Sequence, residues 1–221
     1  MTSPSTSLIQ SLANQGIEVI FSLSGNQIMP LYDACIDVNI QIIHTRHEGA
    51  AVYMAEAYAQ MTGKIGVALV TAGPGLLNAV SALYSAAQSE TPLLLISGDA
   101  ASHLDGRGAF QELNQISVTR PITKLSVRPT QSQDMLPALA TAISTALGGT
   151  PGPVHLALPF DILSAPDADA PLPAIPRPKA SGLSPAQLDK LVTALSAASQ
   201  PIVITGPQAN KSRQPVACEA F

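Results

Sequence analysis

Charged residues are scarce in this 221-residue chain. Asp, Glu, Lys and Arg together make up 12% of it, the formal net charge is -4, and the 11 basic residues are scattered along the sequence. Proteins that bind nucleic acid neutralise its phosphates with clustered Lys and Arg side chains. The scattered charge therefore argues against nucleic acid as a partner.

Cysteine and long apolar runs are scarce as well. The two cysteines, Cys35 and Cys218, lie far apart, so we expect a reducing compartment and no disulfide framework. Residues 1–7 contain neither the basic start nor the apolar stretch of a signal peptide, and we infer no membrane-spanning segment. These absences predict a cytoplasmic protein with no membrane partner.

Helical and extended patterns alternate regularly along the chain, and 46% of its residues are hydrophobic, enough for a large core. We expect strands at residues 19–21, 40–43, 65–70, 92–96, 122–127 and 154–158, and helices at 6–15, 27–37, 48–61, 76–88 and 131–147. The runs 65–70 and 92–96 are almost wholly apolar, which is typical of parallel strands covered on both faces. The pattern predicts an α/β fold, an open, mostly parallel sheet with helices on both faces.

Ligands of such sheets gather at the carboxyl ends of the strands. The loops that follow the first four predicted strands hold Gly25, Glu48, the turn from Gly73 to Gly75, and Asp99. Because these loops share one edge of the sheet, we expect these residues to lie along one rim.

Prolines accumulate after Leu158, and each of them fixes its own backbone angle and removes a hydrogen-bond donor. We therefore expect a first domain over residues 1–163 and a Pro-rich linker over 164–182. Residues 183–221 read as the incomplete start of a second α/β domain, with a helix at 184–197 and a strand at 201–206. This second segment is too short to bury a core of its own.

Each rim motif has a plain structural interpretation when it is taken alone. Glu48 is then a first-turn acid stabilised by the helix dipole, and the glycines at 73 and 75 serve a tight turn. His44 and His47 lie beside Glu48, but their spacing matches neither helical zinc signature, so no metal site is expected.

Taken together, the segments from Arg46 to Ala51 (Arg-His-Glu-Gly-Ala-Ala) and from Thr71 to Asn78 (Thr-Ala-Gly-Pro-Gly-Leu-Leu-Asn) are more specific. They resemble the pyrimidine-binding domain of thiamine diphosphate enzymes of the acetolactate synthase and 2-oxo-acid decarboxylase type. The resemblance implies thiamine diphosphate as cofactor and Glu48 as the catalytic residue. Gly25, Glu48, Gly73, Pro74 and Asn78 are the implied cofactor-binding residues.

The implied task of Glu48 is to share a proton with N1' of the cofactor's pyrimidine ring. That hydrogen bond favours the imino tautomer of the 4'-amino group, which removes the proton from the thiazolium C2. Burial of the carboxyl beside the ring helps, because it disfavours the bare anion. The small residues that follow, Gly49 to Ala51, let a ring approach the helix.

A third segment, from Gly106 to Glu112, again resembles acetolactate synthases, and it makes Phe110 and Gln111 candidate substrate contacts. Phe110 is alternatively an ordinary core residue. The chain departs from acetolactate synthases at Ser24 to Asn26, where many members have Pro-Gly-Gly, and at Leu158 to Asp161, which lacks their lysine. These departures argue against an acetolactate synthase itself and leave open the wider group of decarboxylases and carboligases that act on small-molecule 2-oxo acids.

The family's Gly-Asp-Gly motif, which holds Mg2+ and the diphosphate, does not occur; Gly98 to Ala100 is the nearest match and is rejected. The resemblance therefore implies that Mg2+ is bound by a domain absent from this chain, in a second subunit or chain, and it is compatible with FAD. We expect a homo-oligomeric lyase or transferase of which this is the N-terminal portion, inactive alone. The alternatives are a separate pyrimidine-domain subunit of a two-chain decarboxylase and a non-catalytic interaction module of the same fold.

Overall fold

The computed structural model describes residues 3–165, 182–204 and 206, and contacts divide the chain into two compact units, residues 1–177 and 178–221. In the first unit six strands form one sheet in the order β2-β1-β3-β4-β6-β5, with every neighbouring pair parallel. The strands are β1 (Val19–Ser22), β2 (Gln41–His44), β3 (Gly66–Val70), β4 (Leu93–Asp99), β5 (Leu125–Val127) and β6 (Pro153–Pro159). The predicted open parallel sheet is confirmed.

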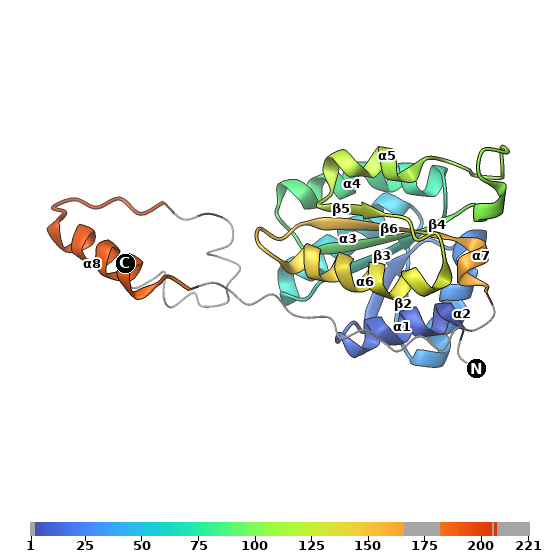
Figure 1. The fold of residues 1–221 in the computed structure, drawn as a ribbon, viewed down its shortest axis with the longest axis horizontal. Helices are drawn as coiled ribbons and strands as arrows, with labels where there is room; N and C mark the ends of the chain where they lie inside the picture. Colours follow the sequence, from blue (N-terminus) through green and yellow to red (C-terminus); the bar gives the residue numbers. More distant parts are fainter. Residues whose placement is uncertain (1–2, 166–181, 205, 207–221) are drawn as a thin grey trace. The chain divides into compact units, whose positions relative to one another are not determined.

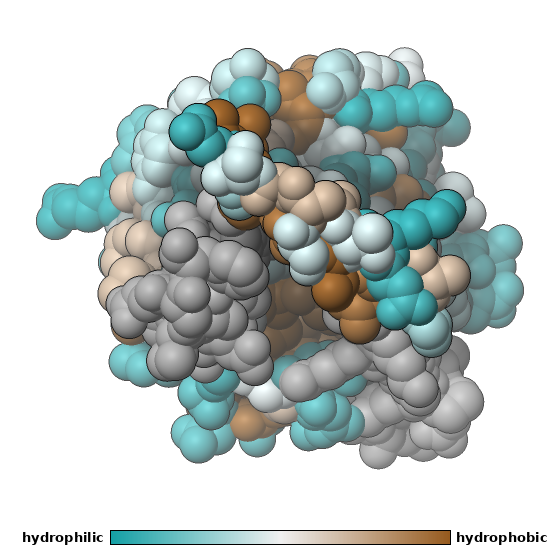
Figure 2. All heavy atoms as spheres, turned by 90° about the vertical axis from the view of Figure 1, so that its left-hand side faces the viewer, coloured by the Kyte–Doolittle hydropathy of each residue, from teal (hydrophilic) through white to brown (hydrophobic). Residues whose placement is uncertain are grey.

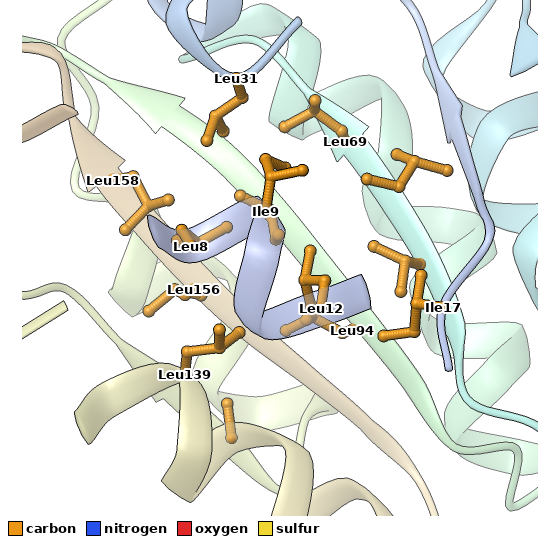
Figure 3. Close-up of a cluster of buried hydrophobic side chains, with 14 of the residues drawn as sticks. Leu8, Ile9, Leu12, Ile17, Leu31, Leu69, Leu94, Leu139, Leu156 and Leu158 are labelled. Carbon is orange, nitrogen blue, oxygen red and sulfur yellow. The ribbon is translucent and has the colours of Figure 1, made fainter. Parts of the chain in front are cut away.

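Helices cover both faces of this sheet (Figure 1). One buried hydrophobic cluster joins the sheet to α1 (Pro4–Asn14), α2 (Met29–Val38) and α6 (Ser132–Leu147). A second cluster joins it to α3 (Glu48–Thr62) and α4 (Pro74–Gln88). In the first cluster Leu8 and Leu12 of α1 lie among Leu94, Leu139 and Leu156 (Figure 3). The N-terminal helix therefore packs over the middle of the sheet.

Burial explains why the central strands read as apolar runs. Every residue of β3, β4 and β6 is buried, whereas the edge strand β2 is exposed at both of its ends. A strand covered on both faces has no solvated side, so its sequence shows no alternation of polar and apolar residues.

The helices α3 and α4 pack closely through small side chains. Their contact is built largely from fully buried alanines, namely Ala51, Ala55, Ala79, Ala82 and Ala86. A buried carboxylate lies at each end of this contact. Glu48 accepts a hydrogen bond from Asn78 (3.0 Å), and Glu56 accepts one from Ser89 (2.6 Å). These two pairs fix the relative position of the two helices.

Several short elements were not predicted: the helices α5 (Gln115–Thr119) and α7 (Phe160–Leu163), and the 3-10 turns η1 (Asn26–Ile28), η2 (Ser102–Leu104) and η3 (Arg120–Ile122). They are too short to show a helical period in sequence. Because η3 occupies residues 120–122, β5 begins at Leu125, three residues later than expected.

The second unit contains α8 (Pro185–Ala197), which the sequence predicted. Ser184 and Gln187 form a capping box at its start, each side chain bonding the other's backbone N–H. The apolar residues Leu188, Leu191 and Val192 are about half exposed on this helix, and Figure 2, which looks onto this unit, shows apolar surface along it.

The predicted strand at 201–206 is wrong for the residues that the structure describes. Residues 201–204 are irregular, and Ile202 and Ile204 are 88% and 92% exposed. A strand is defined by its ladder to a neighbour, and an apolar run without that neighbour stays irregular.

Candidate functional site

The carboxyl ends of the strands bring the predicted rim residues together. Gly25 follows β1, Glu48 follows β2, the Gly73 to Gly75 turn follows β3, and Asp99 ends β4. Since these strands are parallel neighbours in the order β2-β1-β3-β4, their carboxyl ends form one continuous edge. This edge is the candidate site.

Glu48 is the first residue of α3 and is only 8% exposed. His47 caps the helix, its Nδ1 accepting a hydrogen bond from the backbone N–H of Gly49 (3.0 Å). Asn78, on the neighbouring helix, donates from Nδ2 to Oε2 of Glu48 (3.0 Å), and no described residue donates to Oε1. The carboxyl is thus buried, held on one side and free to share a proton on the other.

The start of α4 lies close against this carboxyl because Gly75 has no side chain. A Cβ at Gly75 would lie 3.3 Å from Oε1 of Glu48 and 2.7 Å from Cγ2 of Thr71. Gly73 has a φ of +57°, and a Cβ there would lie 2.7 Å from the carbonyl oxygen of Gln111. Both glycines therefore serve close approaches that a larger residue would block.

Gly25 lies against the same turn. A Cβ at Gly25 would lie 2.3 Å from Cβ of Thr71, whose hydroxyl donates to Oε1 of the buried Gln27 (2.6 Å). The loops after β1 and β3 are thereby locked together. The sequence analysis did not assign a role to Thr71 or Gln27, because their contact joins residues 44 positions apart.

Of the two predicted substrate contacts, Gln111 lies at this edge, with its carbonyl against Gly73. It has a φ of +62°, rare for a residue other than glycine, and its buried Oε1 has no hydrogen-bond partner among the described residues. Phe110 is 75% exposed, so the interpretation of Phe110 as an ordinary core residue is wrong.

Arg128, which the sequence analysis missed, holds the end of β4. Its Nε donates to Oδ2 of Asp99 (2.6 Å), and its two terminal nitrogens donate to Asp105 (2.9 and 3.0 Å). Burial by itself lowers the pKa of Arg128, but the hydrogen bonds and charges of Asp99 and Asp105 outweigh this and raise that pKa. Asp99 is therefore engaged in an ion pair.

His155 on β6 is fully buried in a hydrogen-bonded network away from the rim motifs. Its Nε2 lies 2.8 Å from the Ser97 hydroxyl, and its Nδ1 lies 2.8 Å from the Thr119 hydroxyl. Burial lowers the pKa of His155 to about 3, so the ring is neutral near pH 7. This histidine joins strands β4 and β6 to α5.

Metal and membrane features are absent from the part of the chain that the structure describes. No group of three or more His, Cys, Asp or Glu side chains there is arranged to hold a metal ion, and no helix there is long and apolar enough to cross a bilayer. Cys35 is buried without a disulfide, and burial raises the pKa of its thiol to about 11; Cys218 lies outside the described residues.

A doubly covered parallel sheet with a buried carboxylate and glycine turns on its carboxyl edge defines an α/β ligand-binding domain. The family model for the thiamine pyrophosphate enzyme N-terminal TPP binding domain matches residues 3–118. The chain belongs to this family, as the resemblance predicted.

Known relatives share this domain. The chain is 44% identical to 2-hydroxyacyl-CoA lyase 2 of Homo sapiens over 152 residues, 69% of this chain and 24% of the relative. It is 36% identical to the acetolactate synthase large subunit of Lactococcus lactis over 215 residues, 96% of this chain and 37% of the relative. The solved thiamine diphosphate-dependent 4-hydroxybenzoylformate decarboxylase of Rhodococcus jostii superposes with a TM-score of 0.86 at 27% identity, covering 96% of this chain and 41% of that one. The chain thus spans only a quarter to two fifths of the length of these proteins.

The rim fits thiamine diphosphate as a ligand. Its pyrimidine ring would need a carboxyl in a water-poor place, and the Glu48 carboxyl is buried with no hydrogen-bond partner for Oε1 among the described residues. The glycines at 73 and 75 keep the neighbouring turn free of side chains.

Proposed function

We propose that this chain is the N-terminal part of a thiamine diphosphate-dependent decarboxylase or carboligase acting on 2-oxo acids. The observation that carries the proposal is the buried carboxyl of Glu48, which Asn78 holds at the carboxyl edge of the sheet. The names of two similar proteins, acetolactate synthase and 4-hydroxybenzoylformate decarboxylase, support this reaction class.

In this proposal Glu48 is the catalytic residue, and it holds a proton at the pyrimidine N1'. The bound cofactor supplies a nucleophilic carbon that accepts the electrons released when a bond to the substrate carbonyl carbon breaks. Asn78 orients Glu48, while Gly25, Gly73 and Pro74 shape the wall beside the ring. Phe110 and Gln111 contact the substrate, and Mg2+ and the diphosphate are held by a domain outside these residues.

The proposal is tested by Glu48→Gln in the complete enzyme that carries this chain. Glutamine keeps the acceptor that Asn78 uses, but it cannot take up and return a proton. We expect the C2 proton exchange of bound thiamine diphosphate, followed by NMR, to slow by about 100-fold or more.

Glu56→Gln is the matched control, because Glu56 is a buried glutamate in the middle of the same helix and accepts its hydrogen bonds from Gln60 and Ser89, away from the rim. We expect this variant to exchange at the normal rate. Equal slowing in both variants, or none in Glu48→Gln, would remove Glu48 from the role.

A second candidate function is the cleavage of a carbon–carbon bond in 2-hydroxyacyl-CoA substrates. It is favoured by the identity of 43–45% to 2-hydroxyacyl-CoA lyase 2 from several animals. Glu48 would have the same task in both reactions. Turnover of a 2-hydroxyacyl-CoA without turnover of pyruvate or benzoylformate would decide for this lyase.

The partner in this proposal is a domain or subunit that binds the diphosphate, and it covers the α3–α4 face. We give that name to the exposed side chains Tyr53, Met54, Met61, Leu77 and Tyr84. The two helices contain only two charged residues, Glu48 and Glu56, and both are buried, so this outer face has no charge. An uncharged apolar face beside a binding site is typical of a protein interface.

A further inference from the structure

The loop of residues 101–114, which joins β4 to α5 and carries Phe110 and Gln111, has no core of its own. None of its residues is buried. A cavity of about 280 Å3, lined by Asp99, Glu112, Gln115 and Arg128 among others, lies against its second half. Leu113, near its end, packs against the second hydrophobic cluster, but none of residues 101–112 belongs to either cluster, so apolar packing does not determine where that part of the loop lies.

Polar contacts determine it instead, and Arg128 makes the central one. This side chain follows β5 and is only 21% exposed. It donates to Asp99, the buried last residue of β4, and donates bidentately to Asp105 in the loop. A guanidinium matches two carboxylate oxygens in a fixed plane, so the Asp99–Arg128–Asp105 bridge fixes direction as well as distance.

Two further carboxylates close the loop around this bridge. Glu112 accepts hydrogen bonds from the backbone N–H groups of Gly106 (2.6 Å) and Ala109 (2.9 Å), which folds the segment beside Asp105 into a compact turn. Asp161 accepts from the backbone and the hydroxyl of Ser102 (2.9 and 2.5 Å), which ties down the start of the loop. Among the described residues, the Arg128 bridge is the side-chain ion pair that connects the middle of the loop to the sheet edge.

The bridge has a consequence at the candidate site. Gln111 lies within the turn that the Glu112 N–H closes onto the Ala109 carbonyl (3.0 Å), and it has a φ of +62° with its carbonyl against the Gly73 turn. A left-handed conformation at a residue other than glycine persists only when the surroundings impose it. The turn from Ala109 to Glu112 imposes it directly, and the bridge at Asp105 anchors the segment that carries this turn.

We propose that Arg128 is a positioning residue that sets substrate preference, by holding the 101–114 loop so that Phe110 and Gln111 face the substrate. The substrate part of this inference rests on the proposed function. Arg128 itself contacts no substrate; it acts through Asp105 and the loop.

The test uses Arg128→Gln, Arg128→Lys and Asp105→Asn in the complete enzyme. Loop order is read from the rate of tryptic cleavage after the exposed Arg107, followed by mass spectrometry. We expect cleavage about tenfold faster in Arg128→Gln and Asp105→Asn, because both remove the bridge that restrains local opening of the loop. Arg128→Lys keeps the charge but loses the planar pairing, so its cleavage rate should be intermediate.

Substrate preference is measured as the ratio of kcat/KM for an aromatic and a small 2-oxo acid. We expect this ratio to change about tenfold in Arg128→Gln and Asp105→Asn, and by less in Arg128→Lys. C2 proton exchange of the cofactor should stay within about twofold, since Glu48 is untouched. Lys64→Gln, which breaks the exposed Lys64–Glu18 pair, is the control and should change neither reading.

Asp105→Asn leaves the Arg128–Asp99 pair intact, so it tests the loop even if the Arg128 variants unfold. A looser loop with an unchanged substrate ratio, or an unchanged loop, would overturn the proposal. Failure of the proposed function appears separately, as normal C2 proton exchange in Glu48→Gln.

Discussion

Two glutamates on α3, Glu48 and Glu56, differ in the residues to which they are hydrogen-bonded. Glu48 and Glu56 are buried to almost the same extent, 8% and 7% exposed. Glu56 accepts hydrogen bonds from Ser89 and Gln60, both at Oε1, whereas Glu48 accepts one from Asn78. Both glutamates therefore link α3 to α4 and keep one oxygen without a partner among the described residues, but only Glu48, the first residue of α3, does so at the rim.

Gly73→Ala is a residue-scale test of the rim geometry, because both the φ of +57° and the 2.7 Å approach to Gln111 oppose a side chain there. We expect a loss of about 2–4 kcal/mol in the free energy of unfolding, measured with urea. Gly149→Ala is the control, because Gly149 has a similar φ of +58° with nothing within 4 Å. It should cost only about 1 kcal/mol, the backbone part alone. Equal costs would show that Gln111 does not constrain this position.

Among single residues, the sequence could predict the positions of those that belong to a local sequence pattern. Glu48 follows a strand and opens a helix, and the glycines form a recognisable turn, so the positions of these residues followed from the chain order. Arg128 could not be found in this way, because Asp99 and Arg128 lie 29 residues apart and no local pattern links them. The same holds for Asn78, whose motif was recognised but whose hydrogen bond to Glu48 depends on how α3 meets α4.

Among the elements, three strands and one helix meet at a single imidazole. His155 of β6 reaches Ser97 of β4, Thr119 of α5 and Ser126 of β5. Thr119 also donates to the carbonyl of Gln115. The short helix α5, with few buried residues of its own, is therefore fastened to the sheet through polar contacts.

The pH dependence of stability tests this network. The pKa of His155 is lowered from 6.5 to about 3 by burial, so between these values the unfolded state binds a proton that the folded state does not. Stability is therefore full above about pH 6.5 and falls as the pH decreases toward 3. Between pH 7 and pH 5 we expect a loss of about 2 kcal/mol in urea unfolding.

His155→Asn should be less stable at pH 7, because asparagine is too short to keep contacts on both sides, yet it should lose little further stability down to pH 5. The pKa values of Glu112 and Asp161 are lowered from the ordinary carboxyl range, so these groups do not account for a change in stability between pH 7 and pH 5. An unchanged slope in His155→Asn would contradict the assignment.

For the elements, the sequence predicted what long periodic segments specify. All six strands of the sheet and the long helices were expected, because burial on both faces and helical periods leave clear patterns. A single segment does not specify its pairing partner, which is why the strand predicted at 201–206 is wrong for the described residues 201–204. The helices α5 and α7, of five and four residues, carry too little pattern to be seen.

For the whole molecule, the α3–α4 face is the surface that our proposal assigns to assembly. Tyr84→Arg places a charge on it away from Glu48, and we expect self-association of the complete protein to weaken by about 100-fold, measured by sedimentation. Ile36→Arg is the control, because Ile36 on α2 is 79% exposed and α2 covers the opposite face of the sheet. Loss of assembly in both variants, or in neither, would contradict the assignment of this face.

The hydrogen bond from Asn78 to Glu48 also bears on how tightly a ligand can bind. The carboxyl already lies in one place before any small molecule arrives, since a second helix holds it and Gly75 leaves it room. The rotational freedom of that side chain is thus lost during folding, and in the role that we propose for Glu48 a cofactor ring would not have to organise it. Preorganisation of this kind strengthens association without adding a contact. It would be lost if the side-chain amide of Asn78 were removed.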